Sequence, residues 1–294
     1  MKYIFTILAL IISLNAISQD GTVSEYPMKD GALLWQITNE NNSDTSHLFG
    51  TMHMIESQFY IFPDQLRMLA KNSDAIVMEL PGLPSPYEML KYVMLKDDTL
   101  WNYFGAGQED SLMAWIDEFT DYERSMVKNV FSKMKPFALI QLTTASQFKG
   151  KVESYEMDFT EIANSDSIKI IGLETIADQM KIFDDMSIEE QVEMLMVTVR
   201  DPDADKDLME SMQSIYYSQE IDELYELIHE EDGTIAEKEN AFLTDRNKNW
   251  IGTLKNILPS SKLFIAVGAG HLGGPEGIIR LLQKEGYTLT PIEL

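Results

Sequence analysis

Short apolar runs that alternate with helical stretches constrain the fold of this chain most. Asp74–Leu80 (DAIVMEL) and Lys262–Val267 (KLFIAV) are compact apolar runs of the kind found in strands buried on both faces. Ser167–Gly172 (SIKIIG) is a third such run and ends in glycine. Strands that alternate with helices in this way predict an α/β fold with a mainly parallel or mixed central sheet flanked by helices.

Both ends of the chain add elements to this pattern. Leu33–Thr38 and His47–Phe49 are predicted strands, and the polar stretch between them predicts a hairpin. A helix is expected from Pro63 to Lys71, because proline is favoured in the first turn of a helix. Near the end, a helix over 277–285 is expected to lead into a last strand over 287–292.

The middle of the chain is predicted to be helical. Helical apolar spacing appears near four segments, 86–95, 108–118, 122–132 and 136–149. This stretch is rich in methionine, which is typical of an ordinary core and also suits a lid or cap. We interpret 19–294 as a single domain with a helical insertion at about 86–150. Ser187 and Glu190 form a capping box that predicts a helix start.

The first residues have the three parts of a secretory signal peptide. Lys2 precedes the apolar run Ile4–Leu14, and small residues follow at Ala16 and Ser18. We therefore expect 1–18 to be removed, leaving an extracytoplasmic protein, periplasmic or secreted, without a stable membrane anchor. An uncleaved anchor is the alternative. The chain has no cysteine, so disulfides, a lipoprotein anchor and thiolate metal ligands are excluded.

The acidity of the chain limits its partners. The formal net charge is −25, which repels the phosphates of nucleic acid, so we expect no nucleic-acid partner. Most of these carboxylates are expected to serve solubility.

Two Gly-x-x-His turns are the strongest functional signal. Gly50–His53 and Gly268–His271 each follow a predicted strand, and each leads into a helix and another strand. Ligands of open α/β sheets bind beyond the carboxyl ends of strands, where a histidine can ligate a metal or act as a base. The matching contexts also suggest an internal repeat related by a pseudo-two-fold axis. The alternative for each histidine is an ordinary loop residue.

Several charged residues are further candidates. Glu79 ends a buried strand, so it is either a ligand or acid/base group or a carboxylate that has reached solvent. Glu174 follows another strand and is either a site residue or a first-turn helix carboxylate. Glu56 lies close after His53, and Asp158 is an ambiguous acid. Arg246 would clamp an oxyanion or carboxylate, or pair with nearby acids.

Longer blocks of the sequence resemble a known family. LFGTMH, IVMEL, IIGLET, DRNKNW and VGAGHLGGPEGIIRLLQKEGYTLTPI are similar to the TraB/PrgY/GumN family, which includes the TIKI proteins. The resemblance runs from about residue 31 to 294 and implies a fold like the ChaN and erythromycin-esterase-like group. It also implies a metal-dependent hydrolase, because TIKI proteins are metalloproteases that act on Wnt proteins. TIKI proteins carry a membrane-anchoring tail, and the sequence up to Leu294 shows no such segment. A Wnt substrate is therefore not inferred.

The resemblance also assigns roles by position. The family's two histidines fall on His53 and His271, which with Glu79 would hold a divalent metal: manganese, cobalt or zinc. Glu79 or Glu174 would act as base, and Arg246 would stabilise negative charge. Asn247 completes the Arg-Asn pair of the family, and Gly50 and Gly268 open the two turns.

We therefore expect a metal-dependent hydrolase, most directly a peptidase, acting on a peptide or a small molecule. One alternative is a non-catalytic protein of ChaN-like fold that binds haem or a metal-bearing ligand in the same cleft. Another is an interaction module whose methionine-rich helical middle binds a partner.

Overall fold

The computed structural model describes residues 31–39, 42–148, 150–229 and 240–294. The chain divides into two compact units. A helical unit contains Pro84–Lys151 and Ala177–Glu210. A sheet unit contains the described parts of Ala16–Leu83, Val152–Ile176 and Ser211–Leu294. The helical unit therefore takes in the expected insertion together with a second segment of the chain.

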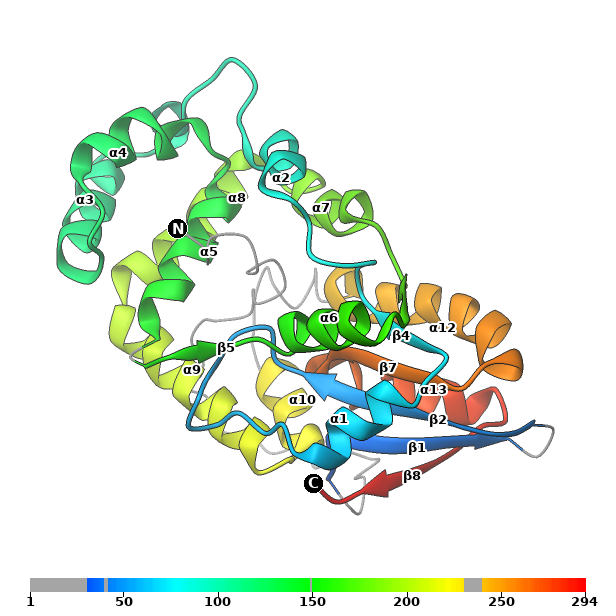
Figure 1. Ribbon diagram of the computed structural model, residues 1–294. Helices are drawn as coiled ribbons and strands as arrows, with labels where there is room; N and C mark the ends of the chain where they lie inside the picture. The colour runs from blue at the N-terminus through cyan, green and yellow to red at the C-terminus, as the bar shows by residue number, and fades with distance from the viewer. Residues whose placement is uncertain (1–30, 40–41, 149, 230–239) are drawn as a thin grey trace. The chain divides into compact units, whose positions relative to one another are not determined.

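A mixed six-stranded sheet forms the centre of the sheet unit (Figure 1). In spatial order its strands are β6 (Lys169–Gly172), β4 (Ala75–Met78), β7 (Leu263–Gly268), β2 (Asn42–Thr51), β1 (Leu34–Asn39) and β8 (Thr288–Ile292). The first four are mutually parallel, whereas β1 is antiparallel to both of its neighbours. The predicted α/β fold with a mixed sheet is confirmed, and β1 and β2 form the predicted hairpin.

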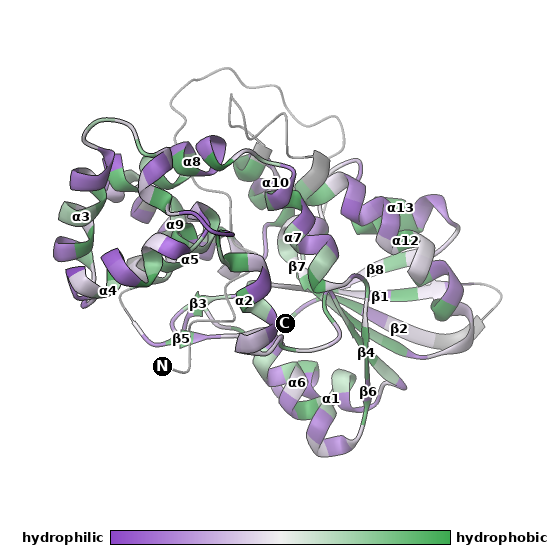
Figure 2. Ribbon diagram, turned by 90° about the horizontal axis from the view of Figure 1, so that it is seen from above, coloured by the Kyte–Doolittle hydropathy of each residue, from purple (hydrophilic) through white to green (hydrophobic). Residues whose placement is uncertain are grey.

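Helices cover both faces of this sheet (Figures 1 and 2). On one face lie α1 (Asp64–Lys71) and α6 (Tyr155–Asp166), and on the other lie α12 (Asp245–Ile257) and α13 (Ile278–Lys284). All four residues of β4 are buried between them. Burial on both faces explains why β4 and β7 appear in the sequence as continuous apolar runs rather than alternating patterns.

The connections place a switch in strand order at the centre of the sheet. From β2 the chain passes through α1 to β4, on the far side of β7. From β7 it passes through α13 to β8, on the far side of β2 and β1. The chain thus leaves the adjacent parallel strands β2 and β7 toward opposite faces of the sheet. Open α/β sheets bind ligands at the carboxyl ends of two such strands. Each Gly-x-x-His turn is therefore followed by a helix and then by a strand, which is the order that the suggested internal repeat requires.

Smaller elements complete the sheet unit. A two-stranded pair, β3 (Ile55–Glu56) and β5 (Val152–Glu153), precedes α6. The helix α10 (Ile221–His229) contacts the short turn η5 (Ala269–His271) that carries the second Gly-x-x-His motif. A π-helical turn, η3 (Asn240–Thr244), leads directly into α12.

The helical unit has a core of its own. Its helices are α2 (Pro86–Val93), α3 (Gln108–Phe119), α4 (Arg124–Asn129), α5 (Pro136–Gln147), most of α7 (Ile176–Asp184), α8 (Ile188–Arg200) and the start of α9 (Pro202–Tyr217). The core contains Met113 and Met196 among leucine, valine and aromatic side chains, so these methionines fill the interior. The capping box of Ser187 and Glu190 starts α8 as predicted.

The sequence misjudged one helix in this unit. A single helix was predicted over 122–132, but α4 ends at Asn129 and a separate 3-10 turn spans Phe131–Lys133. Lys135 is extended because it precedes Pro136, and a residue before proline is disfavoured in the α region. This restriction separates the 3-10 turn from α5, and the Phe131 side chain packs in the core.

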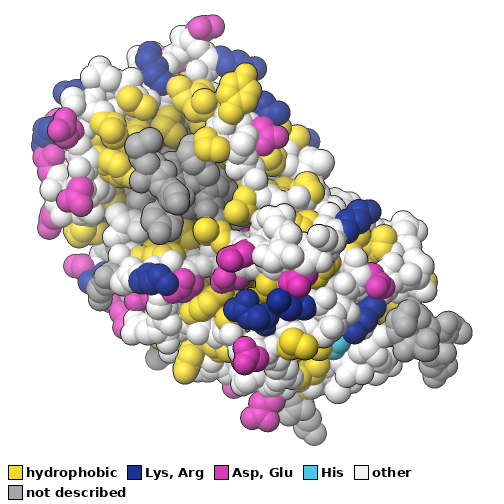
Figure 3. Space-filling model, in the orientation of Figure 1, with side chains coloured by type: hydrophobic (Ala, Val, Ile, Leu, Met, Phe, Trp, Pro, Cys, Tyr) yellow, Lys and Arg dark blue, Asp and Glu magenta, His cyan; other side chains and the backbone are white. Residues whose placement is uncertain are grey.

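Some expectations concern the surface and the ends of the chain. On the face seen in Figure 3, acidic side chains are interspersed with basic and apolar ones, as expected of carboxylates that serve solubility. Among the described residues, no helix is long and apolar enough to cross a membrane. The signal peptide predicted over 1–18 lies outside the described residues.

Candidate functional site

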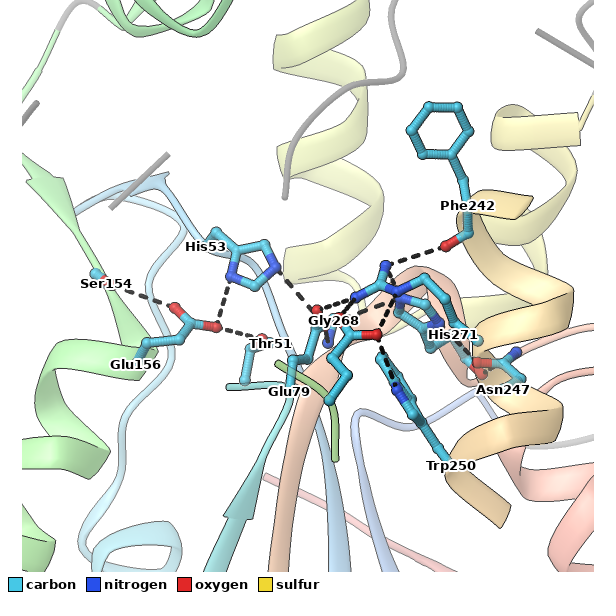
Figure 4. A network of polar contacts seen from close by, with 12 residues as sticks. Thr51, His53, Glu79, Ser154, Glu156, Phe242, Asn247, Trp250, Gly268 and His271 are labelled. Atoms are coloured by element: carbon cyan, nitrogen blue, oxygen red, sulfur yellow. Dashed lines mark hydrogen bonds and ion pairs between the residues drawn. The ribbon is translucent and has the colours of Figure 1, made fainter. Parts of the chain in front are cut away.

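Four neighbouring parallel strands each deliver one polar residue to the same edge of the sheet. In strand order these are Glu174 after β6, Glu79 after β4, His271 after β7 and His53 after β2. Because the strands are parallel, their carboxyl ends meet, and the four side chains join one network (Figure 4). Residues far apart in the sequence are thus brought together at the switch in strand order.

Arg246, in the first turn of α12, is the hub of this network. It forms a two-point ion pair with Glu174, with Nε 3.1 Å and Nη2 2.6 Å from the two carboxylate oxygens. Nη2 also donates to Glu79 Oε2 at 2.5 Å. Nη1 donates to the Phe242 carbonyl at 3.0 Å and to His271 Nε2 at 3.1 Å. A guanidinium has five N–H groups, so every one of them has an acceptor.

The Trp250 ring supports the arginine from one side. The guanidinium carbon lies 4.7 Å from the centre of the indole ring, a cation–π contact. The indole Nε1 donates to Glu174 Oε2 at 3.2 Å, and the same indole packs on the His271 ring with centroids 4.4 Å apart. Arg246 and His271 are therefore held in place by the same side chain.

The tautomer of His271 follows from its two partners. Arginine can only donate, so His271 Nε2 carries the lone pair that accepts from Arg246. On the other side of the ring, Nδ1 lies 2.7 Å from Asn247 Oδ1, while Asn247 Nδ2 donates to the Glu276 carbonyl. Nδ1 is therefore the protonated nitrogen. Burial and the positive charge of Arg246 lower the pKa of His271 to about 3, so the ring is neutral.

His53 has the opposite electrostatic environment. Its Nδ1 lies 2.8 Å from Glu156 Oε1, and its Nε2 lies 3.7 Å from Glu79 Oε1. Burial acts to lower the pKa of His53, but the carboxylates of Glu156 and Glu79 outweigh it and raise the pKa to about 9. The imidazole is therefore protonated at neutral pH.

Glu79 lies between the two histidines. Its Oε1 accepts the Gly268 N–H at 2.9 Å and lies 3.9 Å from His271 Nε2. Burial acts to raise the pKa of Glu79, but Arg246, His53 and the hydrogen bonds lower it well below its usual range. The carboxylate is therefore ionised although it is buried.

This concentration of charge is costly. Each ion taken out of water costs several kcal/mol, and its partners repay that cost only in good geometry, so the network is weak evidence for stability. Buried charges with displaced pKa values are instead typical of functional sites. The side chains of Glu79 and Glu174 are 6% and 7% exposed, whereas those of His53 and Glu156 are 12% and 18% exposed. The Arg246 side chain is 14% exposed, so solvent reaches the network at His53, Arg246 and Glu156.

The glycines of the two turns allow close approach. A Cβ at Gly50 would lie 3.1 Å from the Ala269 Cα, across the two motifs. A Cβ at Gly268 would lie 3.3 Å from Glu79 Oε1. Both contacts are tight, so the absence of a side chain lets the two turns and Glu79 pack together.

The structure leaves other sequence candidates outside this network. Glu56 lies in β3 and accepts a hydrogen bond from Gln58, and Asp158 accepts one from the Tyr60 hydroxyl. His47 is buried in β2. His229 ends α10, and its side chain lies outside the described part of the structure.

The sequence missed Glu156 and Trp250. Glu156 lies two residues before the candidate Asp158, and no motif marks it as the one that reaches His53. Trp250 follows Arg246 by four residues, about one helical turn. This spacing predicts the contact between the two side chains and could have identified Trp250.

A divalent metal is expected from the family resemblance, so its fit to these side chains matters. Two imidazoles and a carboxylate are suitable donor types. Two of the three are already bonded to the Arg246 guanidinium, however: His271 through Nε2 and Glu79 through Oε2. Among the described residues, no group of three or more histidines and carboxylates is placed to hold a metal ion. As they stand, the side chains do not fit a metal, and no reaction step is derived through one.

A family model covers nearly all of the chain that the structure describes. The model of the family described as TraB/PrgY/gumN matches residues 33–291, which includes every residue of the network. No curated protein matches the chain.

Proposed function

We propose that this chain, which belongs to the TraB/PrgY/gumN family, is a hydrolase, most directly a peptidase, that acts at this network. The observation that supports the proposal is the set of buried charges at the switch in strand order. One of its partly exposed members is a histidine with a carboxylate on each side. Sites of this kind, at this place in an α/β sheet, are where ligands bind and proton transfer occurs.

His53 would carry the proton. At neutral pH the ring is mostly protonated, so the reaction would start from its minor neutral form, in which Nε2 takes a proton from water as the water oxygen attacks the carbonyl carbon of the substrate. The imidazolium then gives that proton to the leaving nitrogen as the carbon–nitrogen bond breaks, so the ring returns to its starting state. Glu79, 3.7 Å from Nε2, would stabilise the imidazolium between the two steps.

Arg246 and His271 would position Glu79 rather than touch the substrate. All five N–H groups of Arg246 are used within the protein, so stabilising an oxyanion would require one of these bonds to break. The lone pair of His271 is used in the same way. The metal expected from the resemblance stays a separate prediction, and no step above depends on it. Haem binding in this cleft likewise stays a prediction.

The predicted signal peptide would place this hydrolase outside the cytoplasm. N-terminal sequencing of the exported protein tests that part of the proposal. A mature chain that starts near Gln19 would support it, and a chain that still begins at Met1 would contradict it.

The activity is tested with the mature protein on a mixture of unstructured peptides, with cleavage products read by mass spectrometry. We expect cleavage by the wild type and its loss in His53→Gln. His47→Gln is the matched control, because His47 lies in the same strand β2 outside the network. Equal product formation by the wild type and His53→Gln, or none by either, would contradict the proposal.

A further inference from the structure

We infer that Glu156 is the positioning residue that fixes the His53 ring so that its Nε2 faces Glu79. This inference deepens the proposed function and rests on it for the catalytic consequence. Its geometric content, that a carboxylate from α6 orients the imidazole, can be tested without any activity.

Glu156 holds the turn that carries His53 at two points. Its Oε1 accepts the Thr51 hydroxyl at 2.9 Å and lies 2.8 Å from His53 Nδ1. Thr51 ends β2 and His53 follows two residues later, so one oxygen ties the strand end and the ring together. The other oxygen, Oε2, accepts the Ser154 hydroxyl at 3.2 Å, which fixes the carboxylate (Figure 4).

The two Gly-x-x-His histidines differ in this respect. His271 Nδ1 is held by the neutral amide of Asn247, and its Nε2 is engaged by Arg246. His53 Nδ1 is held by a carboxylate, and its Nε2 faces a second carboxylate at 3.7 Å. A carboxylate on Nδ1 both orients the ring and stabilises its protonated form, whereas an amide only orients it. The repeated motif therefore supplies two histidines with different roles.

A purely structural role for Glu156 is the competing explanation, since its hydrogen bonds would also tie α6 to β2. The two explanations differ over charge. Gln at this position keeps an acceptor for Thr51 and His53 and nearly the same shape, but it removes the negative charge. Burial acts to raise the pKa of Glu156, but His53 and the hydrogen bonds lower it, so the wild-type group is ionised.

The experiment compares Glu156→Gln with Asp158→Asn in the mature protein. Asp158 lies on the same helix two residues away and pairs with Tyr60, so it controls for loss of a carboxylate in α6. The first measurement is ¹⁵N NMR of the His53 ring, which reports which nitrogen carries a proton across a pH series. In the neutral ring, we expect the proton to stay on Nδ1 in the wild type and in Asp158→Asn, and both tautomers to be populated in Glu156→Gln.

The second measurement is peptide hydrolysis. We expect Glu156→Gln to lower kcat by roughly a hundredfold, the scale of general acid–base effects, with KM nearly unchanged. Thr51→Val removes one hydrogen bond to the same oxygen but keeps the charge, so its kcat should fall far less. Glu156→Asp keeps the charge and serves in the NMR series if the glutamine variant does not fold.

A folded Glu156→Gln protein whose neutral His53 ring keeps its proton on Nδ1, as in the wild type, would overturn the inference. Equal losses of kcat in Glu156→Gln and Thr51→Val would also overturn it, because a shared structural cause would then suffice. The NMR result is independent of turnover. A wild type with no activity and a His53 tautomer that depends on Glu156 would therefore refute the proposed function while supporting the role of Glu156.

Discussion

Arg246 Nη1 donates a hydrogen bond to His271 Nε2 at 3.1 Å, and this contact helps to keep the ring neutral. Burial and the positive charge of the guanidinium both lower the pKa of His271, because a second positive charge in a buried site is costly. The ring in turn accepts one of the two N–H groups of Arg246 that point away from the carboxylates, and the Phe242 carbonyl accepts the other. Arg246 can thus hold Glu79 and Glu174 together while leaving no donor unpaired.

Removing Arg246 should destabilise the protein strongly. Arg246→Met keeps much of the volume but leaves Glu79 and Glu174 buried without their counter-ion, so we expect a loss of about 3–5 kcal/mol in the free energy of unfolding. Urea unfolding followed by circular dichroism measures it. Arg124→Met is the matched control, because Arg124 forms a two-point pair with Asp117 at the surface. We expect little change there, because a solvent-exposed ion pair contributes little to stability. Similar losses in both variants would contradict the assigned role of Arg246.

Replacing the amide beside His271 should make the two histidines more alike. Asn247→Asp would place a carboxylate on His271 Nδ1, so we expect the pKa of His271 to rise from its low value. The variant also loses the donor to the Glu276 carbonyl, so some stability should be lost. A ¹⁵N NMR titration of the ring measures the effect. An unchanged titration would show that Arg246 alone controls the charge of His271.

Much of this fold could be predicted because burial on both faces leaves a clear mark. The strands β4 and β7 stand out as apolar runs, and the glycines of the two motifs mark the turns that follow β2 and β7. A parallel sheet then brings the carboxyl ends together, so the meeting of His53, Glu79 and His271 follows from topology. The end of α4 at Asn129 was missed because the apolar spacing continues to Phe131, whose side chain packs in the core from the 3-10 turn that follows.

The charges in the site could not be predicted in the same way. Both histidines sit in the same motif, and only the partner on Nδ1 distinguishes them. Glu156 is 103 residues from His53 in the sequence, and its neighbour Asp158 is equally acidic. Both carboxylates lie in the first turn of α6, and the position of that turn beside His53 decides which of them contacts the ring. The full engagement of Arg246 likewise requires acceptors from four separate segments of the chain.

The protonated state of His53 should make stability fall at alkaline pH. The pKa of the ring is about 9 in the folded protein against 6.5 for the free side chain. The folded state therefore binds more protons between these values, and the stabilisation present below pH 6.5 is lost as pH rises through 9. Urea unfolding at a series of pH values measures it, with His53→Gln for comparison. A wild type and a variant that lose stability in parallel between pH 6.5 and 9 would contradict the assigned charge.

The engagement of Arg246 also predicts how the site should respond to metal. Glu79 Oε2 and His271 Nε2 are bonded to the guanidinium, so a divalent cation would have to displace a positive charge to reach them. We expect weak Mn²⁺ binding by the wild type in calorimetric titration and at least about tenfold tighter binding by Arg246→Gln, a difference of about 1.4 kcal/mol. Arg124→Gln serves as the surface control. Wild-type protein purified with one manganese, cobalt or zinc ion per chain, lost in His53→Ala/His271→Ala, would contradict this expectation. That result would instead support the metal-dependent reaction that the family resemblance implies.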